Sequence, residues 1–137
     1  MSSFKRYFEQ GVGSFTASLN SEARFGSSIA SMFINSDTIP DVAVGAAEND
    51  DGGDKRGAVY VIFFQTTSSL PVSSFKKISD LTGGFTAALA NGDRLGGSIA
   101  SLGDLNYDNN VDILVGATRD DVRYIYHYVK YCYALLC

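Results

Sequence analysis

The sequence predicts an all-β protein built from a repeat, and three observations point to that class. Short runs rich in Val, Ile, Phe, Tyr, Ser and Thr alternate with clusters of Gly, Asn and Asp, as strands alternate with turns. The chain also repeats itself at an interval of about 70 residues. The matching segments are RFGSSIAS at 24–31 with RLGGSIAS at 94–101, and DVAVGA at 41–46 with DILVGA at 112–117. Such a period is typical of units that bury their faces against each other.

The first whole repeat is expected to form four antiparallel strands. Residues 25–33 form the first, with Gly26 at a point where another backbone can approach closely. Residues 41–46 form the second, and their apolar run suggests burial on both faces. Residues 57–64 are β-branched and aromatic, and residues 74–79 carry lysines that suit an edge strand. Four short strands in one repeat are typical of one blade of a β-propeller.

The limits of the repeat predict a partial β-propeller of about two blades. Residues 1–14 match the fourth strand of a blade and are expected to complete a preceding one. Residues 15–80, the first repeat, form a whole blade, and residues 81–137, the second repeat, form a truncated or divergent one. Its third strand is expected within residues 118–128. Because propellers close with about four to eight blades, we expect a fragment of a longer chain, a truncated gene product or a protomer that assembles with others.

Composition and charge exclude several function classes. The 137 residues are 45% hydrophobic and 19% charged, which is typical of a globular chain and not of a disordered one. Acidic residues outnumber basic ones by 15 to 11, and no Lys/Arg run forms a patch, which argues against a nucleic-acid partner. The acidic residues gather in two loops, so cation binding is favoured over anion binding.

The two ends of the chain say little about its compartment. We expect no secretory leader directly after Met1, because no apolar core is visible there. The tail after residue 123 is far shorter than the roughly 20 apolar residues of a spanning helix, so we expect no membrane span in this chain. Cys132 and Cys137 are the only cysteines and are read as structural thiols. The Tyr-rich tail, residues 122–137, is either the core side of a displaced strand, sequence that does not fold natively, or an aromatic recognition face.

The strongest chemical signal is an acidic loop in the second repeat. Oxygen-bearing side chains stand at its positions one, three, five and nine, and position seven offers its main-chain carbonyl: Asp104, Asn106, Asp108, Asp112 and Asn110. Calcium takes about six to eight oxygen ligands from such groups. Asn109 stands at the sharp turn, where a positive φ is needed. The carboxylates favour a divalent ion, since without one they repel each other; an Asx-rich turn without an ion is the alternative.

The corresponding loop of the first repeat is a poorer site. Counted back from Asp41, Asn35 and Asp37 take the places of the amide and the central carboxylate, but Phe33 stands where Asp104 would be. We expect this loop to bind calcium weakly or not at all, with Asn35, Asp37 and Asp41 as its remaining ligands.

Together these motifs resemble the FG-GAP repeat, the blade of the integrin alpha-chain β-propeller and of related surface proteins. The resemblance covers residues 2 to about 118 and rests on the FG or LG step (Phe25-Gly26 and Leu95-Gly96), the acidic loop, and the DVAVGA and DILVGA strands. The proline of the family's GAP motif is absent from both repeats. The resemblance implies a propeller, calcium in the acidic loop, and an extracellular or cell-surface protein that acts in adhesion or protein recognition. Its partners would be a protein ligand or further propeller blades.

Three functions remain open at this point. The first is a non-catalytic calcium-binding module, the second an accessory propeller fragment of a larger hydrolase, and the third a degenerate repeat remnant without ligand. No catalytic motif is present, and we expect no enzyme. The loop 48–56, with Asp50, Asp51 and Asp54, is read as a solvated hairpin loop rather than a second ion site, because its glycines provide no rigid frame.

Overall fold

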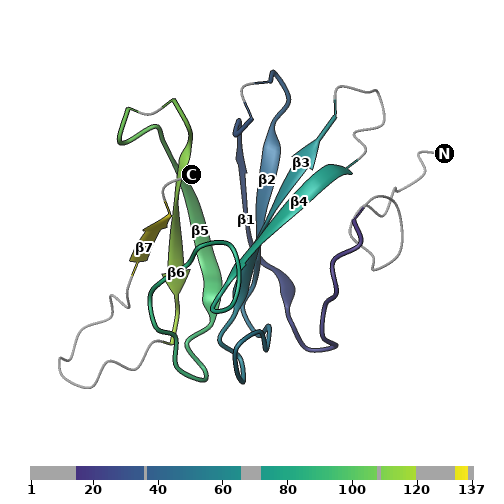
Figure 1. The fold of residues 1–137 in the computed structure, drawn as a ribbon, viewed down its shortest axis with the longest axis vertical. Coiled ribbons are helices and arrows are strands. Elements are labelled where there is room, and N and C mark those ends of the chain that lie inside the picture. The colour runs from purple at the N-terminus through teal and green to yellow at the C-terminus, as the bar shows by residue number, and fades with distance from the viewer. Residues whose placement is uncertain (1–14, 36, 66–71, 108, 120–131, 136–137) are drawn as a thin grey trace.

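The protein forms two antiparallel β-sheets that pack face to face (Figure 1). The computed structural model describes residues 15–35, 37–65, 72–107, 109–119 and the backbone of 132–135. The first sheet contains, in sequential order, β1 (Phe25–Met32), β2 (Asp41–Ala46), β3 (Ala58–Phe64) and β4 (Val72–Ser79). The second contains β5 (Leu95–Gly103), β6 (Asp112–Ala117) and β7 (Cys132–Leu135). The predicted all-β class is confirmed, as is β4 as an edge strand.

The second sheet begins as a copy of the first. Ser101 on β5 lies opposite Ile113 on β6, as Ser31 lies opposite Val42 in the first sheet. The second repeat is one residue longer before its acidic loop, and a register shift between Ser101 and Gly103 accommodates that residue. The first two strands of each repeat are therefore equivalent position by position.

The third strand of the second sheet is not where the sequence predicted it. Thr118 and Arg119 form a turn directly after β6, as Ala47 and Glu48 do after β2. The strand that pairs with β6 is β7, whose backbone at Leu135 lies opposite Ile113. In both repeats a connecting segment thus precedes the third strand, so the strand-like alternation after residue 118 predicted that strand at the wrong position. The rest of that expected strand, residues 120–128, lies outside the described residues, as do residues 1–14.

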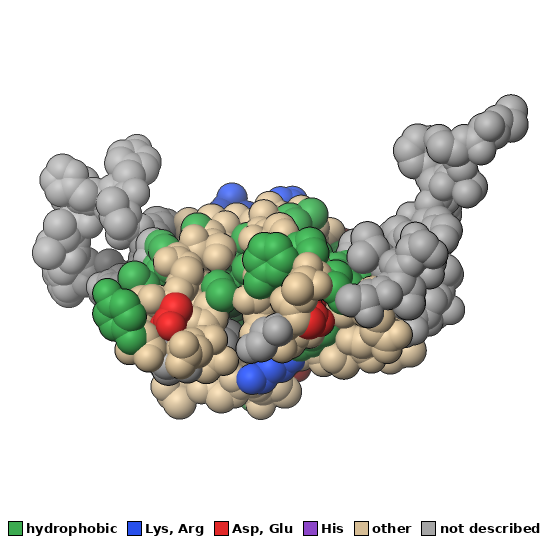
Figure 2. Space-filling view, turned by 90° about the horizontal axis from the view of Figure 1, so that it is seen from above, with side chains coloured by type: hydrophobic (Ala, Val, Ile, Leu, Met, Phe, Trp, Pro, Cys, Tyr) green, Lys and Arg blue, Asp and Glu red, His purple; other side chains and the backbone are tan. Residues whose placement is uncertain are grey.

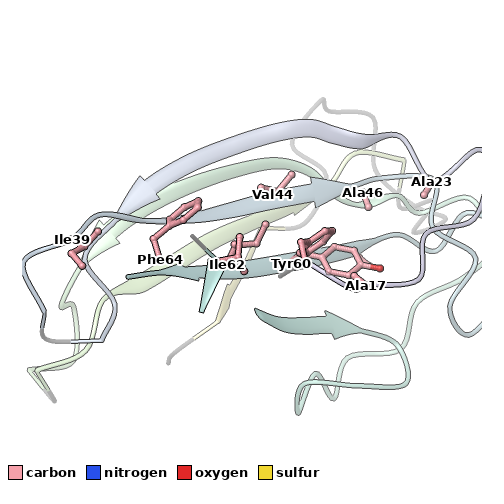
Figure 3. Packing of buried hydrophobic residues seen from close by; sticks show 11 residues of the cluster. Ala17, Ala23, Ile39, Val44, Ala46, Tyr60, Ile62 and Phe64 are labelled. Carbon is pink, nitrogen blue, oxygen red and sulfur yellow. The ribbon is translucent and has the colours of Figure 1, made fainter. Parts of the chain in front are cut away.

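The central strands β2 and β3 are buried on both faces, as the run Val42–Val44 suggested. One face belongs to an outer core on the side of the first sheet away from the second (Figure 3). There Tyr60 and Ile62 of β3 lie beside Val44 of β2, all almost fully buried. Phe15, from the segment before β1, covers them, and its ring lies 5.4 Å from that of Phe25. The opposite face belongs to an inter-sheet core.

The inter-sheet core shows that the sheets stack head to tail. Val59 and Val61 of β3 belong to the same buried cluster as Ile113 and Val115 of β6, and all four are at most 2% exposed. Ile113 and Val115 are the repeat counterparts of Val42 and Val44, which point into the outer core. The face that the second sheet packs on the first is therefore the counterpart of the face that lines the outer core of the first sheet, as expected if successive units of a repeat array pack in the same way.

A close backbone contact sets the spacing between the sheets. A Cβ on Gly45 of β2 would come within 2.0 Å of the carbonyl oxygen of Gly96 on β5. The hydroxyls of Ser27 and Ser28 on β1 donate to that same oxygen at 3.1 and 2.7 Å. Only glycine allows such an approach, and Gly96 also has a φ of 85°.

The close approach that we expected at Gly26 is absent. Nothing described lies within 4 Å of the position that its Cβ would take, although its φ is 94°. Gly26 is the repeat counterpart of Gly96, and the contact of Gly96 is made with the sheet before its own. The contact therefore belongs to the junction between two sheets, and the described residues contain one such junction.

Replacing Gly45 by Ala tests this contact, and Gly116→Ala is a matched control. Gly116 holds the same place in β6, but the atoms nearest to its added Cβ belong to Ser98, chiefly the hydroxyl of a side chain that can rotate. We expect Gly45→Ala to lower the free energy of unfolding by about 2 kcal/mol more than Gly116→Ala, because backbone atoms cannot move aside. Urea denaturation followed by circular dichroism measures both. Equal losses would show that the sheets are not in close contact here.

Candidate cation-binding loops

The two acidic loops lie at the same end of the molecule, each joining the first two strands of its sheet (Figure 1). Figure 2 looks onto this end and shows acidic side chains set apart among hydrophobic ones. Three hydrophobic side chains of the two loops are strongly exposed: Phe33, Leu105 and Tyr107. The surface around the candidate sites is therefore apolar as well as acidic.

Two carboxylates shape the loop of the second sheet. Asp112, at the start of β6, is fully buried, and its Oδ2 accepts the N–H of Leu105 at 2.8 Å. Oδ2 of Asp104 accepts the N–H of Asn109 at the same distance. The loop doubles back through positive φ angles of 61° at Tyr107 and 68° at Asn109. The positive φ expected at Asn109 is thus observed, whereas the one at Tyr107 was not anticipated.

One buried oxygen of this loop is uncompensated. Oδ1 of Asp112 has no hydrogen-bond partner in the described part of the chain. In the first sheet, Oδ1 of the equivalent Asp41 accepts the N–H of Phe64 at the end of β3, at 3.0 Å. By the pairing of Leu135 with Ile113, the counterpart of Phe64 is Cys137, outside the described residues. A buried carboxylate oxygen without a partner is costly, and either a strand N–H or a cation would satisfy it.

The structure describes four of the five predicted ligands. Asp104 is partly buried, Asn106 and Asn110 are exposed, and Asp112 is buried, whereas Asp108 lies outside the described residues. Among the residues that are described, no group of three Asp, Glu, His or Cys side chains could hold a metal ion. Of the five predicted ligands, only Asp104 and Asp112 are described carboxylates, so the predicted set stays a prediction.

The loop of the first sheet is closed by its own N–H groups. Oδ2 of Asp41 accepts the N–H of Ile34 at 3.4 Å, the counterpart of the Leu105 bond. Oδ1 of Asp37 accepts the N–H of Ile39 at 2.8 Å, and Oδ1 of Asn35 accepts that of Asp37 at 3.3 Å. Oxygens engaged in this way are less free to bind a cation.

Burial raises the pKa of Asp41 above its ordinary value. The N–H donors of Phe64 and Ile34 act in the opposite sense, and the nearby Asp37 carboxylate raises the pKa further. Because the charged form is disfavoured at this buried position, the carboxylate contributes stability at low pH that is lost as the pH rises through the folded-state pKa.

The equivalence of the Ile34 and Leu105 bonds also confirms that Phe33 stands in the place of Asp104.

The loop 48–56 is more firmly held than its glycines suggested. The N–H of Lys55 donates to Oδ1 of Asp50 at 2.9 Å. The Asp51 carboxylate accepts the Ser79 hydroxyl and lies 3.1 Å from the Lys77 ammonium. Burial alone would raise the pKa of Asp51, but Ser79 and Lys77 together lower it below 3.8. The expected solvated loop is therefore a fixed one, held by the carboxylates of Asp50 and Asp51.

Sequence reasoning missed a group of charged residues where this loop meets the second sheet. Glu48 is 5% exposed, and its two carboxylate oxygens lie 3.3 Å from Nε of Arg24 and 2.5 Å from Nη2 of Arg94. The two arginines occupy the same place in successive repeats. The signal that could have revealed this group is the replacement of Glu48 by Arg119 at the equivalent position of the second repeat.

Comparison with known proteins gives a distant likeness to a segment of integrin alpha chains. Integrin alpha-11 of Mus musculus is 33% identical over 108 residues, and that of Homo sapiens is 34% identical over the same length. Each match covers 75% of this chain, which spans 8% of the length of either relative. No protein-family model matches the chain. Among the described residues, no helix is long and apolar enough to cross a membrane.

The lowered pKa of Asp51 predicts a pH-dependent contribution to stability. Because the folded-state pKa lies below 3.8, the contribution is complete above that pH and is lost as the pH falls through the folded-state value. We expect Asp51→Asn to lower the free energy of unfolding by about 1 kcal/mol at pH 7. The difference from the unaltered chain should vanish in acid. Asp54→Asn, which makes the same charge change at an exposed position of the loop, should cost little at any pH; a similar loss in both variants would contradict the pairing.

Proposed function

We propose that this chain is a non-catalytic, calcium-binding part of an FG-GAP β-propeller in an integrin-alpha-like protein. The parent protein would be extracellular or on the cell surface and would act in adhesion or protein recognition. The chain's likeness to integrin alpha-11 and the repeated motifs support the family. Residues 15–80 and 81–137 would be successive blades, and residues 1–14 the end of a preceding one.

The stacking of the sheets supports successive blades. The four-stranded first sheet has the strand order of a blade, and the face of the second sheet that packs on the first is the counterpart of the face of the first sheet that lines the outer core. Further blades of a longer chain would extend the array on both sides. Exposed Phe33, Leu105 and Tyr107 beside the acidic loops support a contact with another protein at that end.

The observation that carries calcium binding is that the buried Oδ1 of Asp112 has no hydrogen-bond partner among the described residues. Carboxylate, amide and carbonyl oxygens form the donor set that calcium prefers, so the residues fit the ion. The ligands would be the side chains of four residues and the main-chain carbonyl of a fifth: Asp104, Asn106, Asp108, Asp112 and Asn110. The ion would supply positive charge to a buried carboxylate and would hold the end of β5 against the start of β6.

Thermal unfolding of the full chain with calcium and with a chelator tests the site. Extracellular sites often bind calcium at about 0.1 to 1 mM. At ten times the dissociation constant, linkage adds about 1.4 kcal/mol, which corresponds to a rise in Tm of about 5 °C. We expect Asp112→Asn to abolish that rise and Asp41→Asn, its counterpart in the first sheet, to keep it. A Tm that calcium does not change would show that a strand N–H, and not a cation, satisfies Asp112.

Restoring the missing carboxylate of the first loop tests the difference between the loops. Phe33 is 56% exposed and stands in the place of Asp104. We expect calorimetry to find one calcium ion per unaltered chain and a second, weaker one in Phe33→Asp. Phe33→Ser removes the same aromatic ring without adding a carboxylate and should still bind one ion. Two tight ions in the unaltered chain would contradict the predicted weakness of the first loop.

A further inference from the structure

A hollow lined by cationic side chains lies at the junction of the two sheets, at the end opposite the acidic loops. Its volume is about 250 Å3, it is partly open to solvent, and five residues line it: Lys55, Asn91, Gly92, Arg94 and Arg119. β5 begins there, at the pairing of Leu95 with Ala117, and runs from there to the acidic loop. The hollow is therefore separate from the proposed calcium site.

The backbone around the hollow is fixed from both sides. The N–H groups of Gly92, Arg94 and Leu95 donate to the carbonyls of residues 54, 55 and 56 at 2.9, 3.1 and 2.8 Å. The loop of the first sheet and the start of β5 are thereby joined by three hydrogen bonds. Lys55 and Arg94, which come from different repeats, are held beside each other by this ladder.

The two repeats have the same backbone conformation but side chains of opposite charge at one position, Glu48 in the first and Arg119 in the second. Arg24 and Arg94 both adopt a positive φ, of 49° and 60°. The N–H of Glu48 donates to the carbonyl of residue 23 at 3.1 Å, and that of Arg119 to the carbonyl of residue 93 at 3.0 Å. In the first repeat, Arg24 thus faces a carboxylate of its own sheet, 3.3 Å away. In the second repeat, Arg119 takes the place of this carboxylate, beside Arg94.

The positive charge of the hollow is only partly neutralised. Arg94 turns to Glu48 of the first repeat, which it shares with Arg24, and its buried Nε has no hydrogen-bond partner among the described residues. Within the described part of the chain, neither the Lys55 ammonium nor the Arg119 guanidinium forms an ion pair. The Asp93 carboxylate, just before β5, is 2% exposed and accepts the N–H of Ala90 at 2.6 Å.

We propose that this hollow binds a small tetrahedral oxyanion, phosphate or sulfate, either free or as an ester group on a partner molecule. The anion would supply the negative charge that Glu48 supplies in the first repeat. Two guanidinium groups and an ammonium are the donors that such oxyanions prefer, and the buried Nε–H of Arg94 has no hydrogen-bond partner among the described residues. This site does not depend on calcium, and its test is independent of the calcium titration.

The test is a titration of the full chain with inorganic phosphate and with phenyl phosphate, followed by 15N NMR. We expect saturable shifts at the amides of Gly92 and Arg94 and at the Arg94 Nε–H. Arg119→Glu should weaken binding at least about tenfold and keep or raise the Tm, because it recreates the ion pair of the first repeat. Lys76→Glu makes the same charge change at an exposed position of β4 and should leave the affinity within about twofold. Lys55→Gln gives a second, less disruptive variant that should also weaken binding.

The outcomes separate the sources of the anion and can overturn the proposal. Tighter binding of phenyl phosphate than of phosphate would indicate an ester group on a partner, and binding of phosphate alone would indicate a free ion. The absence of saturable shifts with either probe would overturn the proposal. That result is expected if the carboxylate of Asp120 or Asp121 neutralises the positive charge of the hollow. Equal weakening by Arg119→Glu and Lys76→Glu would also overturn it, since it would reflect net charge alone.

Discussion

The arrangement of the two sheets depends on the backbone contact between Gly45 and Gly96. With no side chain between them, β2 approaches the start of β5 so closely that Ser27 and Ser28 reach the Gly96 carbonyl. This contact fixes where β5 begins relative to the first sheet. The apolar faces then meet at the register that buries Val59, Val61, Ile113 and Val115. Glycine sets the geometry here, and burial of apolar area supplies the stabilising free energy.

The junction between the two sheets also determines which charged groups lie near each other at either end of the sheets. At one end, the chain that enters β5 is hydrogen-bonded to the loop between β2 and β3, which places Lys55 beside Arg94. At the other end, β5 and β6 diverge into the acidic loop, and Asp112 is buried where β6 starts. The length of the strands thus separates the hollow, where arginines share the Glu48 carboxylate, from the acidic loops at the other end.

Local patterns in the sequence predicted the features that are local. The strand 41–46 and its burial on both faces follow from an apolar run between turn residues, and Asn109 adopts the positive φ that its position required. Features set by a neighbouring sheet were not predictable in this way. Gly26 has the sequence signal of a close contact but no such contact with the described residues, because that signal belongs to a junction between sheets. The third strand of the second sheet was misplaced, since the alternation after Ala117 resembles a strand whereas the connection there has to turn first.

The differences between the repeats are more informative about chemistry than their similarities. Glycines, register and apolar faces keep the backbone of both repeats equivalent, so a side chain can change without moving its neighbours. Where Phe33 replaces a carboxylate, the loop of the first sheet is satisfied by its own N–H groups. Where Arg119 replaces Glu48, an ion pair within one sheet becomes a cluster of like charges that shares a carboxylate with the neighbouring sheet. When two repeats share a backbone and differ in the sign of one charge, excess positive charge is held at a fixed position. A ligand of negative charge is the simplest group that neutralises it.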